Sequence, residues 1–229
     1  LFRQMMPLSP VLPMPEGPLA SQRYHLKNTM YGIGDAGILS AMIHYLKPAR
    51  IIEVGSGFSS AVTLDTLDML GLEARCTFTG PHTSRLESIL RPADRSRVDI
   101  IQRNVQDVDL QLFSQLGHND ILFLDTTHVS KTGSDVNFEI FEVLPRLSSG
   151  VIIHFHDVFD KFEYPNQWVY EENRSWNEIY MLRAFLMYNR EFEVIYANDS
   201  FAKNRRSVIQ ELRPALLRNA GGGLWLRKR

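Results

Sequence analysis

The chain of 229 residues, 44% of them hydrophobic, is long enough for one sizeable core and too short for two ordinary domains. A net charge of −1 gives no basic surface for nucleic acid and no acidic tail, so we expect a small molecule as partner. No apolar run approaches the roughly 20 residues of a membrane helix, and the N-terminal residues lack the apolar core of a signal peptide. With one cysteine, Cys76, the chain has no internal disulfide, and we expect it in the cytoplasm.

Residues 1–28 are predicted to form a proline-rich N-terminal arm, followed by one domain over residues 29–229. Five of the eleven prolines fall within the first eighteen residues, and prolines sustain neither a helix nor a central strand. We therefore expect an extended arm that lies against the body or docks on a neighbouring copy, which makes a homo-oligomer a candidate state.

Apolar strand-like segments then alternate with helical ones. A helix is predicted over residues 35–46, and strands such as "ILFL" and "VIIHF" are apolar on both faces, which is typical of central parallel strands. The predicted order is strand 50–54, helix 60–70, strand 75–79, helix 84–90, strand 98–102, short helix 110–116, strand 120–125, helix 137–147 and strand 150–157. This rhythm predicts an α/β fold: a doubly wound, Rossmann-like, mostly parallel sheet of about seven strands, with helices on both faces.

The rhythm changes after residue 157. Residues 158–178 hold two tryptophans, two tyrosines and many charges without a clear period, and we interpret them as an aromatic, lid-like insertion. A helix is predicted from about Trp176 to Met187, then a strand over 192–198, an interrupted helix over 208–218 and a closing strand after the glycines at 221–223.

The stretch "EVGSGFSS" follows the first strand and opens a helix. Gly55 and Gly57 allow a sharp turn and close approach of a ligand to the backbone, and Ser59 and Ser60 lie at the amide-rich helix start. Glu53 would repel a pyrophosphate but favour a cationic amino-acid group. Ser60 stands where dinucleotide folds place a third glycine, so a dinucleotide dehydrogenase is disfavoured.

Together with "FLDTTH", "GVIIHFHD" and "GGGLWLRK", this turn resembles the class I S-adenosylmethionine-dependent methyltransferases, in the subgroup with small-molecule and sugar O-methyltransferases. The resemblance covers roughly residues 30–229 and implies an antiparallel last strand. It implies that S-adenosylmethionine is the cofactor and that the cofactor-binding residues are Glu53, Gly55, Ser56, Gly57, Ser59, Ser60, Gly80, Val105, Gln106 and Asp107. Val105 would pack on the adenine and Asp107 would accept from its amine, although a turn-forming aspartate explains Asp107 equally well.

One position departs from the family pattern. Where an acid usually grips both ribose hydroxyls, this chain has Gly80. The loss of such charge-assisted contacts implies weaker cofactor binding, a substitute such as His82 or Thr83, or a lost activity. The sequence leaves these alternatives open.

Two of the predicted strands, 120–125 and 150–157, end in an acidic residue, Asp125 and Asp157. Two carboxylates side by side favour a cation between them, and Mg²⁺ binds through such a pair together with water and substrate oxygens. Related O-methyltransferases use a divalent ion to acidify the substrate hydroxyl, so Asp125 and Asp157 are candidate metal ligands. His128, in a D-x-x-H arrangement with Asp125 that resembles macrolide-sugar methyltransferases, is the candidate catalytic base, with a loop or capping histidine as the alternative.

The sequence gives fewer indications of the residues that would contact the methyl acceptor. His156 near a strand end, with Tyr164, Trp168 and Trp176 from the insertion, are the candidate substrate residues, although each aromatic side chain would also suit packing of the loop. His156 beside Asp157 also suggests a non-haem iron site, as in an oxygenase.

The sequence thus predicts an S-adenosylmethionine-dependent enzyme that methylates an oxygen of a small hydroxylated acceptor of sugar or natural-product type. A domain that binds the cofactor without turnover, favoured by Gly80, and an iron-dependent oxygenase are the alternatives.

Overall fold

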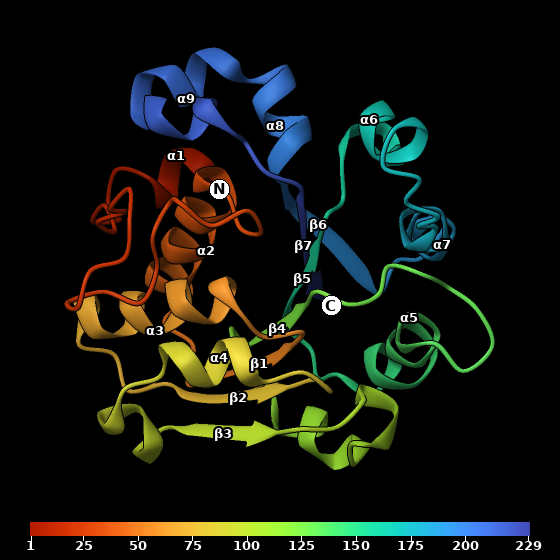
Figure 1. Cartoon of the computed structure of the whole chain (residues 1–229). Helices are drawn as coiled ribbons and strands as arrows, with labels where there is room; N and C mark the ends of the chain where they lie inside the picture. The colour runs from red at the N-terminus through yellow and green to blue at the C-terminus, as the bar shows by residue number, and fades with distance from the viewer.

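A computed structural model of all residues, 1–229, shows a seven-stranded sheet enclosed by helices (Figure 1). The strands are β1 (Arg50–Val54), β2 (Arg75–Thr79), β3 (Val98–Ile101), β4 (Ile121–Leu124), β5 (Ile152–His156), β6 (Phe192–Ala197) and β7 (Gly223–Lys228). Their order is β3-β2-β1-β4-β5-β7-β6, with β7 antiparallel to both of its neighbours and all other adjacent pairs parallel. The predicted doubly wound sheet and its antiparallel last strand are confirmed.

The central strands are apolar on both faces because each face packs on its own layer of helices. Ile51 of β1 and Phe123 of β4 belong to one buried cluster, whereas their neighbours Ile52 and Leu122 belong to a second cluster on the opposite face. Successive side chains of a strand point to opposite faces, so this alternation places the sheet between two hydrophobic layers.

The helices divide between these layers, with α2 and α3 on one side of the sheet and α5 and α7 on the other (Figure 1). The helices are α1 (Phe2–Met5), α2 (Ile33–Leu46), α3 (Phe58–Leu70), α4 (Ser84–Ile89), α5 (Asp135–Phe138), α6 (Asn166–Tyr170), α7 (Glu178–Leu186), α8 (Asn198–Asn204) and α9 (Arg206–Leu212). Short 3₁₀ turns link several of them, including Leu110–Gln115 where a short helix was predicted. No helix in the structure combines the length and the apolar character needed to cross a membrane.

The N-terminal arm lies against the body of the domain. Its first residues form α1, so the prediction that this part of the arm holds no helix was wrong: α1 ends before the first proline, at position 7. Phe2 is buried against Phe201, with ring centroids 4.8 Å apart. Farther along, Arg23 is buried and its guanidinium forms ion pairs with Asp65 at 2.8 Å and Asp94 at 2.6 Å.

The helix predicted over residues 137–147 is irregular. α5 passes into a π-helical turn, Glu139–Val143, and then into a 3₁₀ turn that contains Pro145. Proline has no amide hydrogen to continue an α-helical ladder, which explains the break. Glu139 is fully buried in this turn, and neither of its carboxyl oxygens has a hydrogen-bond partner.

Candidate active site

The site lies where the strand order reverses, at the carboxyl ends of β1 and β4. The Gly55 amide donates to the Thr79 carbonyl at 2.9 Å, and the Asp125 amide donates to the Val54 carbonyl at 2.9 Å, so both strand ends are fixed. Gly55 has φ of +84°, and a Cβ there would lie 1.7 Å from the Asp125 carbonyl oxygen. Only glycine fits where the ends of β1 and β4 lie this close together.

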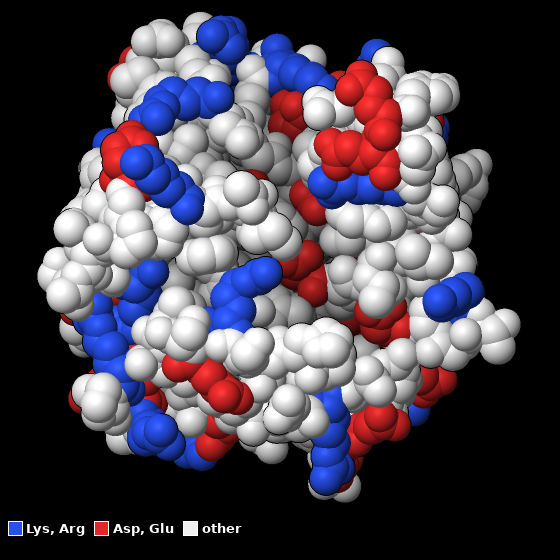
Figure 2. All heavy atoms as spheres, viewed as in Figure 1, with Lys and Arg blue, Asp and Glu red and all other residues white.

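Two cavities meet at these two strand ends and share Gly55, Asp125 and Thr126 in their walls. The larger, about 510 Å³, also includes Gly57 and Ser59 of the glycine turn. In the space-filling view the molecule is hollowed near its centre, with acidic atoms in the hollow and basic atoms beside it (Figure 2). An elongated ligand could therefore lie across the turn, with one end in each cavity.

The carboxyl group of Glu53 lies beneath the glycine turn. Glu53 is fully buried, its Oε1 accepts from the Ser59 hydroxyl at 2.5 Å, and its Oε2 has no partner. Burial raises the pKa of Glu53 to about 8. The hydroxyl of Ser56 is also buried without a partner, whereas that of Ser60 accepts from the Gly57 amide at 3.0 Å and is occupied in shaping the turn.

The smaller cavity, about 260 Å³, is lined by Gly80, Val105 and Gln106, three of the residues predicted to bind the cofactor. Val105 is buried, which suits packing against a flat apolar ring. Asp107 lies outside both cavities: it is exposed and accepts from the side chain of Asn104 at 3.3 Å. The structure thus agrees with the turn-forming alternative for Asp107, because its carboxylate faces solvent beyond the cavity wall.

Neither His82 nor Thr83 replaces the missing acid at Gly80. The nearest atoms to a Cβ built there are 3.8 Å away, so the position is open. His82 is exposed, and the hydroxyl of Thr83 donates to Glu87 at 2.7 Å, so neither side chain lines the cavity as a substitute.

His128 lies between the two strand-end acids. Its Nε2 is 3.4 Å from Asp125 Oδ1 and 3.7 Å from Asp157 Oδ2. Both His128 and Asp157 have positive φ, at 57° and 56°, a conformation that is uncommon outside glycine and is concentrated at functional sites. The structure therefore brings together the three residues that the sequence placed at two separate strand ends.

Glu178 completes this cluster, and the sequence did not indicate it. Its Oε2 is 2.7 Å from His128 Nδ1, and both side chains are almost completely buried. The backbone reinforces the contact, since the amide of Glu178 donates to the His128 carbonyl at 3.1 Å. A lone glutamate at a helix start carries no signal of a contact fifty positions away, so only the fold reveals this role.

The charges of the cluster support one another. Burial opposes the imidazolium of His128, but Asp125 and Glu178 outweigh it and raise the pKa of His128 to about 10. Burial also opposes the charge of Asp125, yet His156 and His128 hold the pKa of Asp125 below its usual value. For Asp157 burial prevails and raises the pKa. Without ligands, His128 thus carries a proton that both aspartates face.

The donor set partly suits a metal ion. Two carboxylates are enough for Mg²⁺, which keeps several waters and takes one or two protein carboxylates. No group of three or more His, Cys, Asp or Glu side chains in the structure is arranged to hold a metal ion. Since Glu178 already binds His128 Nδ1, the protein offers a hydrated cation the pair Asp125 and Asp157, and offers iron no facial triad.

The aromatic insertion covers the cluster. Trp176 lies against the His128 ring at 4.2 Å between centroids, and the guanidinium of Arg174 lies 4.0 Å from the ring centre of Trp168 and 4.7 Å from that of Trp176. Both tryptophans line the larger cavity, but Tyr164 does not: it packs behind Trp176, and its hydroxyl accepts from the Ile179 amide at 3.3 Å. Tyr164 therefore agrees with the packing alternative and not with a substrate contact.

A third cavity of about 440 Å³ continues from the cluster on the side of β7. It shares Thr29, Met30, Tyr31, His156, Asp157 and Trp168 with the larger cavity. Its other polar side chains are Asn28, Asp35, Asp199 and Asn219, and it contains no lysine or arginine. Burial raises the pKa of Asp35 to about 6, and the amide of Asn198 donates to its Oδ1 at 2.8 Å.

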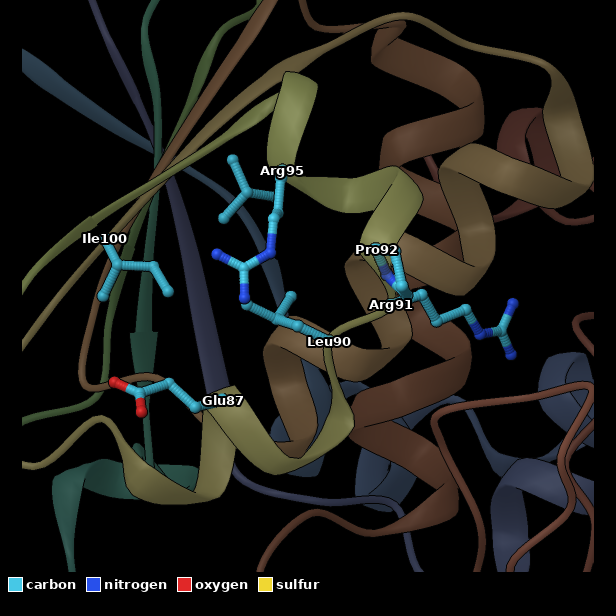
Figure 3. A pocket seen from close by; sticks show the side chains of 7 residues that line it. Glu87, Leu90, Arg91, Pro92, Arg95 and Ile100 are labelled. Carbon is cyan, nitrogen blue, oxygen red and sulfur yellow. The ribbon is translucent and has the colours of Figure 1, made fainter.

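The largest hollow lies elsewhere, beside β3 at the edge of the sheet. It has a volume of about 700 Å³ and is lined by side chains such as Glu87, Leu90, Arg95 and Ile100 (Figure 3). It contains none of the residues at the carboxyl ends of β1, β4 and β5. We therefore place the active site at the carboxyl ends of these strands.

Comparison with known proteins finds a match over this part of the chain. Residues 52–158, which run from β1 through the end of β5, match a family model described as "Methyltransferase domain". No curated protein sequence matches the chain.

Solved structures share the fold at low sequence identity. The structure of the Podospora anserina methyltransferase PaMTH1 bound to SAH is 19% identical, with a TM-score of 0.52 over 85% of this chain and 77% of that one. The plantazolicin methyltransferase BpumL with SAH is 15% identical, with a TM-score of 0.54 over 86% and 82%. CmcI in its Mg-SAM form is 17% identical, with a TM-score of 0.51 over 88% and 74%. The chain thus shares the fold of these methyltransferases, and its residues 52–158 match the methyltransferase-domain model.

Proposed function

We propose that this protein transfers a methyl group from S-adenosylmethionine to a hydroxyl oxygen of a small acceptor of sugar or natural-product type. The observation that carries the proposal is the position of His128 Nε2 between Asp125 and Asp157, at the wall of the larger cavity. Methyl transfer to a hydroxyl requires alignment of donor and acceptor and removal of one proton.

The donor side has the features that the cofactor needs. S-adenosylmethionine supplies the activated methyl group. Glu53 Oε2 is buried and unpartnered, so it can accept from the ammonium group of the methionine part. Gly55 permits close approach, and Val105 and Gln106 line the adenosine side. We assign Ser56 and Ser59 to the same end as Glu53.

The acceptor side suits a neutral, hydroxylated molecule. The carboxylate and amide side chains around the third cavity can accept and donate hydrogen bonds to hydroxyl groups, while Trp168 offers an apolar face. The absence of lysine and arginine from its wall disfavours an anionic acceptor. We propose His156, Trp168 and Trp176 as substrate contacts.

His128 is the proposed proton acceptor, with Glu178 as its positioning residue. The protonated state of free His128 would not accept a proton, since its pKa is about 10. The donor brings a positively charged sulfonium into the same cavity, and a nearby positive charge favours the neutral imidazole. Glu178 fixes the ring so that Nε2 faces the cavity.

We further propose that Asp125 and Asp157 hold Mg²⁺, which would lower the pKa of an acceptor hydroxyl when bound. CmcI, whose structure with Mg and SAM has this fold, supports the idea as a comparison only. Titration of the chain with Mg²⁺ should give heat that Asp157→Asn abolishes and Asp109→Asn, which changes an aspartate outside the site, retains.

We place the protein in the cytoplasm, supported by the buried free thiol of Cys76. We propose no nucleic-acid or membrane partner. Self-association remains a proposal: the packed arm leaves Leu8 and Val11 exposed, at 70% and 67%, and size-exclusion chromatography with light scattering would test it.

A second candidate is a domain that binds the cofactor without turnover. The open position at Gly80 favours it, because neither His82 nor Thr83 lines the cavity in place of the missing acid.

Release of S-adenosylhomocysteine, measured against a panel of hydroxylated acceptors, separates the two functions. His128→Gln should keep calorimetric binding of S-adenosylhomocysteine and lower turnover by about 10²- to 10⁴-fold. His118→Gln is the matched control and should keep both properties, because this exposed histidine precedes the start of β4, at the opposite end of that strand from the cluster. Binding without turnover on any acceptor would favour the second candidate, and no binding would refute both.

A further inference from the structure

Arg85 is a free cation in the wall of the donor cavity. It belongs to α4, the short helix after β2, and its side chain crosses the glycine turn, with Cδ 3.3 Å and Nη1 3.6 Å from the place of a Cβ on Gly57. The same cavity wall includes Gly55, Gly57 and Ser59. Arg85 is thus held directly over the turn where the amino-acid end of the donor would lie.

The guanidinium of Arg85 has no hydrogen bond and no ion pair in the structure, and its one polar interaction is with the ring of Phe58, whose centre lies 5.9 Å away. Other arginines in the chain, such as Arg23, Arg97 and Arg146, pair with carboxylates of the protein. An arginine that faces a cavity without a partner has donors available for a ligand, and its planar fork suits a carboxylate.

A second group close to the glycine turn is also unsatisfied. Glu53 Oε2 is buried without a partner at the same turn, and α3 presents the amides of its first turn beside it. The site therefore offers a cation and an unpartnered carboxyl oxygen close to one glycine turn. The methionine part of the donor carries the complementary pair, a carboxylate and an ammonium group.

We propose that Arg85 binds the α-carboxylate of the methyl donor and, with Glu53, makes the amino-acid end the main determinant of cofactor affinity in this protein. This inference rests on the proposed use of S-adenosylmethionine. Gly80 supports this inference. A donor whose ribose hydroxyls are not bound by an acid must draw more of its affinity from other contacts.

The test compares two ligands that differ in one group. Calorimetry of the wild-type chain with S-adenosylmethionine and with its decarboxylated form should give about 10- to 100-fold tighter binding of the first, the range expected for a charge-assisted hydrogen bond. Arg85→Gln should remove this preference while it leaves the affinity for the decarboxylated form unchanged, which also shows that the variant is folded.

Arg95→Gln is the matched control. Arg95 is an exposed arginine ten positions further along, in the hollow beside β3, so this variant loses the same charge away from the turn (Figure 3). It should keep the wild-type preference for the carboxylate.

The outcomes are distinguishable. Unchanged binding of S-adenosylmethionine by Arg85→Gln would overturn the role of Arg85 and leave the proposed function standing. An equal loss for both ligands would also overturn it, because Arg85 would then act on the shape of the turn. A wild-type chain that binds neither ligand would overturn the proposed function together with this inference.

Discussion

His128 Nδ1 lies 2.7 Å from Oε2 of Glu178, a residue fifty positions later in the chain. This contact ties the loop after β4 to the first turn of α7, so the histidine at the cavity wall is oriented by an element beyond the aromatic insertion. When one nitrogen of an imidazole is bound in this way, the other is directed at the site.

Glu178→Gln should lower turnover by about 10- to 100-fold and leave the affinity for S-adenosylhomocysteine unchanged. The glutamine keeps the size of the side chain but removes the charge that supports the imidazolium. Steady-state kinetics over a pH series would check this, because the variant should also shift the pH profile. A loss of cofactor affinity of the same size would assign Glu178 to the structure of the cavity.

Gly55→Ala should destabilise the fold far more than Gly71→Ala. Both glycines have positive φ, at +84° and +62°, so alanine costs about 1–2 kcal/mol of backbone strain at either position. At Gly55 the new Cβ would also lie 1.7 Å from the Asp125 carbonyl oxygen, whereas nothing lies within 4 Å at Gly71. Urea unfolding should show an additional loss of about 1–3 kcal/mol at Gly55. Equal losses of stability at Gly55 and Gly71 would contradict the close approach of the ends of β1 and β4.

Glu53 should make the apoprotein less stable as the pH rises. Its pKa is about 8 in the fold, against its ordinary value of 4.5, so the folded state keeps a proton that the unfolded state releases. The free energy of unfolding should fall between these two pH values, by at most about 1.4 kcal/mol per pH unit. Glu53→Gln should remove this slope, so the stability of the variant relative to wild type increases over the same window. Denaturant titrations at pH 5 and pH 8.5 measure the difference, and a parallel pH dependence of the two proteins would refute it.

Arg23→Gln should destabilise the chain by about 3–5 kcal/mol, because it leaves the buried carboxylate of Asp65 without its cation and removes one of the two arginines that pair with Asp94. Arg75→Gln is the control: the pair of Arg75 with Asp99 is exposed, and its loss should cost less than about 1 kcal/mol. Thermal or urea unfolding of both variants tests the anchor of the N-terminal arm. Similar small losses would show that the arm is held by its apolar contacts alone.

The sequence by itself determined the order of strands and helices and the edge of the sheet that carries the site. Strands that are apolar on both faces require cover on both sides, and this requirement predicts a parallel sheet. Gly55, Asp125 and Asp157 each follow such a strand, and parallel strands bring their carboxyl ends to one edge. Local spacing was enough for these residues because each one is attached directly to a strand end.

Only the tertiary structure decided which loop residues meet at that edge. Glu178 reaches His128 and Arg85 crosses Gly57 because helices far along the chain pack at the same end of the sheet, which no local period records. Asp107 and Tyr164 have residue types that suited a site, yet one faces solvent and the other packs behind Trp176. Strand ends follow from the periodicity of the chain, whereas the direction of a loop side chain depends on the packing of every element around it.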